Sequence, residues 1–75
     1  MFARLPNANP KDVVKALERA GFYLQRQQGS HATFRHPVTH HTTVVPMHTG
    51  DIARWLLKKI IKQAGLSEDQ FHDLL

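Results

Sequence analysis

The stretch FYLQRQQGSHATFRHP, residues 22–37, decides the fold of this chain. It begins with β-forming residues in which apolar Phe22 and Leu24 alternate with less apolar neighbours, as is typical of a half-buried strand over residues 22–28. Gly29 and Ser30 then form a short turn, and HATFRH, residues 31–36, forms the returning strand. The stretch therefore predicts an antiparallel β-hairpin.

The returning strand has two different faces, because successive side chains of a strand point in opposite directions. His31 and Arg35 share one face, and Phe34 lies on the other. We expect Phe34 to pack inward with Phe22 and Leu24. This leaves His31 and Arg35 on an open face of the sheet.

Further elements follow on both sides of the hairpin. Residues 42–47, TTVVPM, predict a third strand after a loop at 37–41, and Pro46 places it at a sheet edge because proline cannot donate a ladder hydrogen bond. Asn9 and Pro10 are typical of a helix start, and Gly21 of a helix end, which predicts a helix over 10–20. A second helix is predicted from Asp51 to Ala64, and Ser67 caps a last one over 68–75.

The second helix has an apolar stripe and a basic face. The stripe is predicted to be core and consists of Ile52, Leu56, Ile60 and Ala64, with Leu57 and Ile61 beside them. The basic face carries Arg54, Lys58 and Lys62 in one row, with Lys59 and Trp55 alongside. Such a patch on a small domain with a net charge of +4 favours an anionic polymer, nucleic acid first. An ordinary solvated basic surface is the alternative.

The element order α-β-β-β-α-α predicts a two-layer α+β domain, with a three-stranded antiparallel sheet covered by helices on one face. Double-stranded RNA-binding domains share this layout. The 75 residues are expected to form one domain over 1–75, without the help of cysteines, since there are none. The N-terminal MFARLPNANP has no apolar signal segment and no run is long enough for a membrane span, so we expect a cytoplasmic protein.

The open face carries the parts of an RNA-cleaving site. Near neutral pH an imidazole such as that of His31 can take a proton from a ribose 2′-hydroxyl, and a guanidinium such as that of Arg35 can hold the phosphate. Gly29 lets a bulky ligand approach the backbone of the turn. A surface histidine without a role is the alternative.

Three segments together, LPNANPKDVVKALERAGF, RQQGSHATFRHP and VVPMHTGDIARWLLKKIIKQAGLSEDQF, resemble the HicA family of toxins from type II toxin-antitoxin systems. The most specific pieces are Gly-Ser-His at 29–31, Val-Pro-x-His-x-Gly at 45–50 and Lys-Gln-Ala-Gly-Leu at 62–66. The resemblance implies a metal-independent endoribonuclease with a fold like that of a double-stranded RNA-binding domain. Such toxins cut mRNA and are silenced by a HicB antitoxin that covers the active site.

The resemblance places the catalytic histidine at His31 and the active-site turn at Gly29 and Ser30. The chain departs from the family pattern at Ala32, where many members have a polar residue, and at Trp55, where a small residue is commoner. Because Ala32 faces the core, we expect no effect on chemistry. Trp55 is expected to cover the helix packing or to contact the antitoxin, and it could instead stack on a base.

The expected reaction is attack of the ribose 2′-hydroxyl on the adjacent phosphorus, with His31 as general base. His48 is the preferred proton donor to the leaving 5′-oxygen, and His36 is the other candidate. The residues expected to bind RNA phosphates are Arg26, Arg35, Lys58, Lys59 and Lys62. Neither a metal nor a small-molecule cofactor is expected, and mRNA and the antitoxin are the expected partners.

Three other functions compete with this prediction. Zinc binding by His36, His40, His41 and His48 matches no known ligand spacing and lacks a cysteine. A non-catalytic RNA-binding module would keep the basic helix without needing His31. A pure protein-interaction domain, such as a decayed toxin that still binds its antitoxin, would need neither the basic helix nor His31.

Overall fold

A computed structural model describes residues 7–48 and 50–75. The elements are, in order, α1 (Pro10–Arg19), β1 (Tyr23–Gln28), β2 (His31–Arg35), β3 (Thr42–Pro46), α2 (Arg54–Gln63) and α3 (Glu68–Leu74). The predicted order of helices and strands is therefore confirmed. Residues 1–6 and Thr49 lie outside the described residues. They include the start of the segment LPNANPKDVVKALERAGF, most of the N-terminal stretch in which no signal segment was expected, and one position of the Val-Pro-x-His-x-Gly motif.

The three strands form one antiparallel sheet in the order β1-β2-β3. Pro46 ends β3, which lies at a sheet edge as predicted. β1 is the other edge, and its pairing with β2 shifts by one residue between Leu24 and Arg26. Gln25 is the extra residue of this β-bulge, which bends β1 and increases its local twist.

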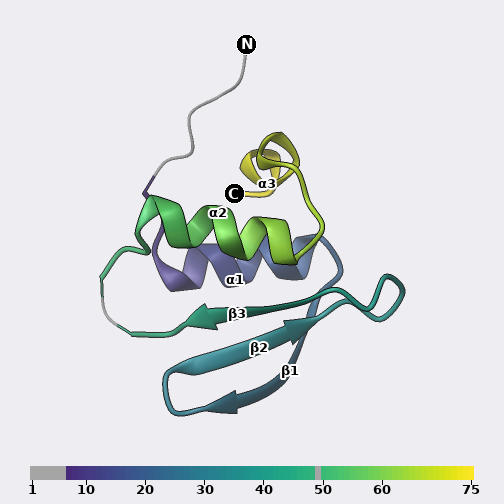
Figure 1. The fold of residues 1–75 in the computed structure, drawn as a ribbon, viewed down its shortest axis with the longest axis horizontal. Coiled ribbons are helices and arrows are strands. Elements are labelled where there is room, and N and C mark those ends of the chain that lie inside the picture. The colour runs from purple at the N-terminus through teal and green to yellow at the C-terminus, as the bar shows by residue number, and fades with distance from the viewer. Residues whose placement is uncertain (1–6, 49) are drawn as a thin grey trace.

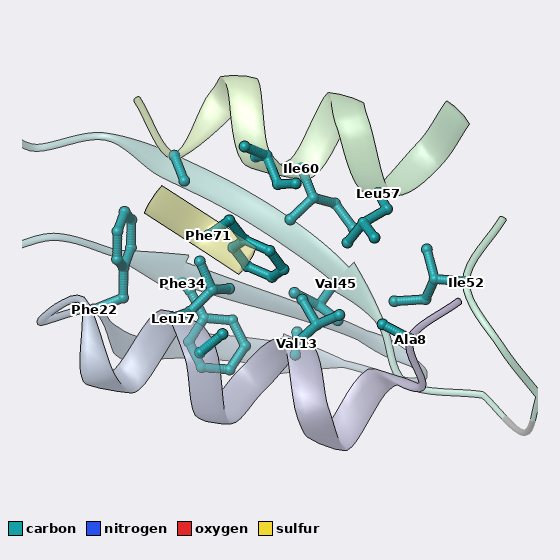
Figure 2. Packing of buried hydrophobic residues seen from close by; sticks show 14 residues of the cluster. Ala8, Val13, Leu17, Phe22, Phe34, Val45, Ile52, Leu57, Ile60 and Phe71 are labelled. Carbon is teal, nitrogen blue, oxygen red and sulfur yellow. The ribbon is translucent and has the colours of Figure 1, made fainter. Parts of the chain in front are cut away.

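The helices lie on one face of the sheet, which confirms the two-layer α+β architecture. Figure 1 shows α1 and α2 beside the sheet, and α3 packs against both of these helices. Apolar side chains from the helices and from the inner face of the sheet meet in one cluster around Phe71 (Figure 2). Its fully buried members include Val13, Leu17, Val45, Leu57, Ile60, Ile61 and Phe71.

The hairpin contributes less to the core than predicted. Phe22 and Phe34 are buried as expected, but the side chain of Leu24 is 50% exposed and every residue of β1 is exposed. The expected packing of Leu24 was wrong because β1 is an edge strand whose residues all remain exposed. Leu24 is the ladder partner of the buried Phe34, but its position at the edge of the sheet leaves it half-exposed.

Helix capping follows the predicted chemistry at two of the three starts. The side chain of Asn9 accepts a hydrogen bond from the backbone N–H of Asp12 at 3.0 Å, and Ser67 forms a capping box with Gln70. These contacts satisfy backbone N–H groups that the first helical turns leave unpaired.

The second helix begins later than predicted, at Arg54 in place of Asp51. The backbone N–H of Ile52 donates to the carbonyl of Ala8 at 2.9 Å, and this isolated bridge holds the chain extended. Ile52 is buried as expected, but through the bridge and not through the helical stripe. Leu56, also expected in the core, is only half-buried.

Candidate active site

His31 is the first residue of β2 and follows the turn at Gly29 and Ser30. It lies between Gln28 of β1 and Pro46 of β3, its partners in the two ladders. The turn is held against the end of β3 by a hydrogen bond from the N–H of Met47 to the carbonyl of Ser30. The edge of the molecule that carries His31 is therefore fixed by backbone pairing on both sides.

The imidazole of His31 is exposed and unengaged. Within residues 7–48 and 50–75, it makes no hydrogen bond or ion pair. Both ring nitrogens are therefore open to a ligand, as a general base requires.

A groove of about 260 Å³ runs between β3 and α2 and contains His31 at one side. Val44 and Pro46 form its wall on the strand, and Leu56 and Ile60 form its wall on the helix. β3 and α2 are in contact, so side chains of both elements reach this groove. The polar residues that line it with His31 are Lys59 and Gln63. The fold thus brings a basic side chain from α2 to the candidate catalytic histidine of β2.

Both candidate arginines belong to the same outer face of the sheet as His31. Arg26 is the ladder partner of Thr33, and Arg35 lies about 13 Å along β2 from His31. An Nη atom of Arg35 lies 3.1 Å from the Nδ1 atom of His40. A strictly alternating strand would place Arg26 on the face of Leu24, and the bulge at Gln25 is what allows both orientations.

His36 has a structural role. Its Nδ1 atom accepts hydrogen bonds from the N–H groups of Val38 and Thr39, at 3.1 and 3.2 Å, so the proton of the neutral ring lies on Nε2. That atom donates to the carbonyl of Ala20 at 3.1 Å. The ring also packs edge-to-face against Phe22, with centroids 5.2 Å apart. His36 therefore connects the end of α1 to the loop after β2, and neither nitrogen is left for catalysis.

Comparison with known families adds to this geometry. A family model described as HicA toxin of bacterial toxin-antitoxin systems matches residues 10–66. The chain belongs to the HicA toxin family. It is therefore the toxin of a toxin-antitoxin system, whose partner is an antitoxin. No curated protein matches the chain in sequence. The match covers α1, the sheet, the His31 groove and α2, whereas α3 lies beyond it.

The basic face of this HicA toxin is divided between two hollows. Lys59 lines the His31 groove, whereas Lys58 and Lys62 line a second hollow together with Ser67 and Glu68. All three lysines were expected to bind RNA phosphates from one basic face. Only Lys59 of the three reaches the groove of the candidate catalytic histidine.

His48 lies in a third hollow, which Asn9, Lys11 and Met47 also line. The structure therefore does not bring His48 into the groove of His31. The position of His48 does follow directly from β3, since it is two residues beyond Pro46, or about 7 Å along an extended chain.

Trp55 is 69% exposed on α2, so it does not cover the helix packing. The first of the roles expected for it is wrong, and contact with a partner or a base stays a prediction. In the described part of the chain, no group of three or more histidine or acidic residues is placed to hold a metal ion. Over the same residues, no helix is long and apolar enough to span a membrane.

Proposed function

We propose that this toxin is an endoribonuclease that cleaves mRNA in the cytoplasm, with His31 as its general base. The observation that carries the proposal is the unengaged imidazole of His31 in a groove shared with Lys59. Arg26 and Arg35 on the same sheet face supply positive charge along a path for the phosphate backbone. The charge of these residues gives affinity without sequence preference.

In the proposed reaction, the imidazole of His31 removes the proton of a ribose 2′-hydroxyl. The 2′-oxygen forms a bond to the adjacent phosphorus, and the bond from phosphorus to the 5′-oxygen breaks. The products are a 2′,3′-cyclic phosphate and a 5′-hydroxyl. The nucleophile belongs to the substrate, so the reaction requires no metal. The ammonium group of Lys59 would stabilise the charge that develops on the phosphoryl oxygens.

The leaving 5′-oxygen needs a proton. His36 is engaged with the backbone at both nitrogens, so His48 is the better of the two candidates. For His48 to give its proton to the 5′-oxygen, the phosphate that is cut must lie close to Pro46, between the groove and the hollow that contains His48. If His48 is the donor, His48→Ala slows cleavage without changing RNA affinity. An unchanged rate would assign the proton to another group.

We also propose that the antitoxin is of the HicB type and is acidic, and that it covers His31. The net charge of +4 and the exposed Trp55 on the basic helix favour such a partner, because tryptophan is frequent among the residues that dominate interfaces. Protection of His31 from diethyl pyrocarbonate in the purified complex would support this arrangement. Equal modification in the free toxin and the complex would contradict it.

The main experiment compares the toxin with its His31→Ala and His72→Ala variants on a long RNA in the presence of EDTA. His72 is an exposed histidine of α3, which packs on the helices away from the sheet (Figure 1), and is the matched control. We expect cyclic phosphate ends from the toxin and from His72→Ala, and a rate roughly 10²- to 10⁴-fold lower for His31→Ala. Since the His31 side chain is exposed and unbonded, this variant should unfold at the same denaturant concentration as the toxin.

A non-catalytic RNA-binding module is the alternative function. It would bind the RNA with the same affinity before and after the His31→Ala change and would cut it in neither case. Fluorescence anisotropy of a labelled RNA, measured alongside the cleavage assay, separates the two functions.

A further inference from the structure

The groove beside His31 has an apolar character that phosphate binding does not explain. Val44 and Pro46 line it from β3, and Leu56 and Ile60 line it from α2. Val44 is 40% exposed and Leu56 only half-buried, so apolar surface of both elements is open to a ligand. Phosphates are held by cationic side chains and N–H groups, which need no apolar walls.

We propose that this groove binds one unstacked nucleobase of single-stranded RNA, next to the phosphate at which the chain is cut. The inference rests on the proposed ribonuclease function and adds the substrate class: an unpaired nucleotide at the cleavage site. Nucleobases are flat, largely apolar on their faces and polar at their edges. A groove with two apolar walls and a few polar groups matches these properties.

The size of the groove agrees with a single ring system. Its volume of about 260 Å³ lies just below the range of about 300–1,000 Å³ that is typical of sites for drug-sized ligands. His31 and Lys59 also line it, so a base held between the walls has its own ribose and phosphate near both side chains. A base that is stacked in a duplex cannot enter, because recognition of this kind needs an unpaired base.

Gln63 is the residue of the groove that is suited to recognise the edge of the base. The hydroxyl of Thr43 is buried and lies 3.1 Å from the carbonyl of Ile60 and 3.2 Å from the Oε1 atom of Gln63. A hydroxyl has a single proton and donates to one of these two oxygens. If the proton goes to Gln63, its Oε1 atom accepts it; if the proton goes to Ile60, the Gln63 amide is turned so that its NH2 group donates to the Thr43 oxygen. With either orientation, one end of the Gln63 amide is bonded to Thr43 and its other end remains for a ligand in the groove.

Thr43 is thus a positioning residue for Gln63. It is buried on the helix side of β3, between the strand and α2, whereas Gln63 lines the groove itself. An amide held in this way differs from the flexible ammonium of Lys59, because its hydrogen-bonding direction is fixed before the substrate arrives. Fixed direction is what allows one base edge to be preferred over another.

The test is cleavage of a single-stranded RNA with randomised sequence, followed by sequencing of the cut ends, for the toxin and for the Gln63→Leu and Asn7→Leu variants. Asn7 carries the same amide group, is exposed before α1 and lies outside the groove, so Asn7→Leu is the matched control. We expect the toxin and Asn7→Leu to share a base preference at one position beside the cut. In Gln63→Leu this preference should weaken about fivefold, the effect of one neutral hydrogen bond, while cleavage continues.

Thr43→Val, which keeps the shape of the side chain but removes its hydroxyl, should weaken the same preference in the same direction. A second arm compares the single strand with the same RNA annealed to its complement, and we expect at least tenfold slower cutting of the duplex.

Equal rates on the two forms, or the same cut-site bases in the toxin and in Gln63→Leu, would overturn the inference. A Gln63→Leu change that only weakens inhibition by the antitoxin would also overturn it, by assigning the groove to a protein side chain. Failure of the toxin to cut any RNA would refute the proposed function itself, and is distinguishable from these outcomes.

Discussion

The close approach of Gly21 to His36 leads to a prediction about the stability of the fold, which tests the structural role of His36. Gly21 follows α1 with a φ of +99°, a conformation that side chains other than glycine rarely adopt. A Cβ atom at this position would lie 2.8 Å from the Nε2 atom of His36. That atom is held in place by its hydrogen bond to Ala20, so the ring cannot move away without losing it. Gly21→Ala therefore meets two separate costs.

The magnitude follows from these two costs. The backbone conformation costs about 1–2 kcal/mol for a residue with a Cβ atom. Loss of the hydrogen bond between His36 and Ala20 costs about 0.5–1.5 kcal/mol more. We therefore expect Gly21→Ala to lower the free energy of unfolding by about 2–3 kcal/mol. A chain of 75 residues has roughly 4–11 kcal/mol in total, so this is a large fraction.

The assay is urea unfolding followed by far-ultraviolet circular dichroism. Trp55 is too exposed to report unfolding well by fluorescence. Gly29→Ala is the control, because Gly29 also has a positive φ, of +57°, but a Cβ there meets no heavy atom within 4 Å among residues 7–48 and 50–75. This control should lose only about 1 kcal/mol. Equal losses for the two variants would refute the role of His36.

Three further changes test other parts of the molecule. Phe71→Ala should lower the free energy of unfolding by about 3–5 kcal/mol, since the ring is fully buried, and urea unfolding would then show that α3 belongs to the stable fold although it lies beyond the family match. Asn9→Ala should cost about 1 kcal/mol in the same assay, because it removes the cap of α1. Lys59→Ala should slow RNA cleavage about 100-fold, the effect of removing one group that stabilises the developing charge. Lys62→Ala, outside the His31 groove, should change only RNA affinity and its salt dependence. Equal losses of cleavage rate in the two variants would contradict the special place of Lys59.

Local chemistry is what made much of the fold predictable. Asn9 before Pro10, Ser67 before its acidic turn, and Gly29 with Ser30 between two strands each fix the backbone through contacts a few residues apart. Such signals are present in the sequence itself and need no knowledge of the tertiary structure. The predicted edge position of β3 also depends on a single residue, Pro46, whose missing N–H is a local property.

The features that could not be predicted depend on which elements lie next to each other. Leu24 has the same strand pattern as a buried residue, but its strand lies at the edge of the sheet and leaves it exposed. Alternation cannot reveal the bulge at Gln25, which decides the face of Arg26. Lys58 and Lys59 are neighbours in sequence, but they line different hollows because α2 packs beside β3. Lys59 lines the His31 groove, and Lys58 lines the hollow near Ser67.

The two histidines of the hairpin show why a candidate site needs the structure before its residues can be ranked. His31 and His36 are five positions apart, at the two ends of the same predicted strand, and have the same titratable ring. In the fold, three backbone groups hold the ring of His36, whereas no group in the described chain holds that of His31. We therefore expect that replacing His36 destabilises the protein and that replacing His31 leaves it folded. Both changes would reduce toxicity in a growing cell, since loss of folded protein and loss of chemistry have the same outward effect. Only the folded fraction, measured on the purified variants, distinguishes a catalytic histidine from a structural one.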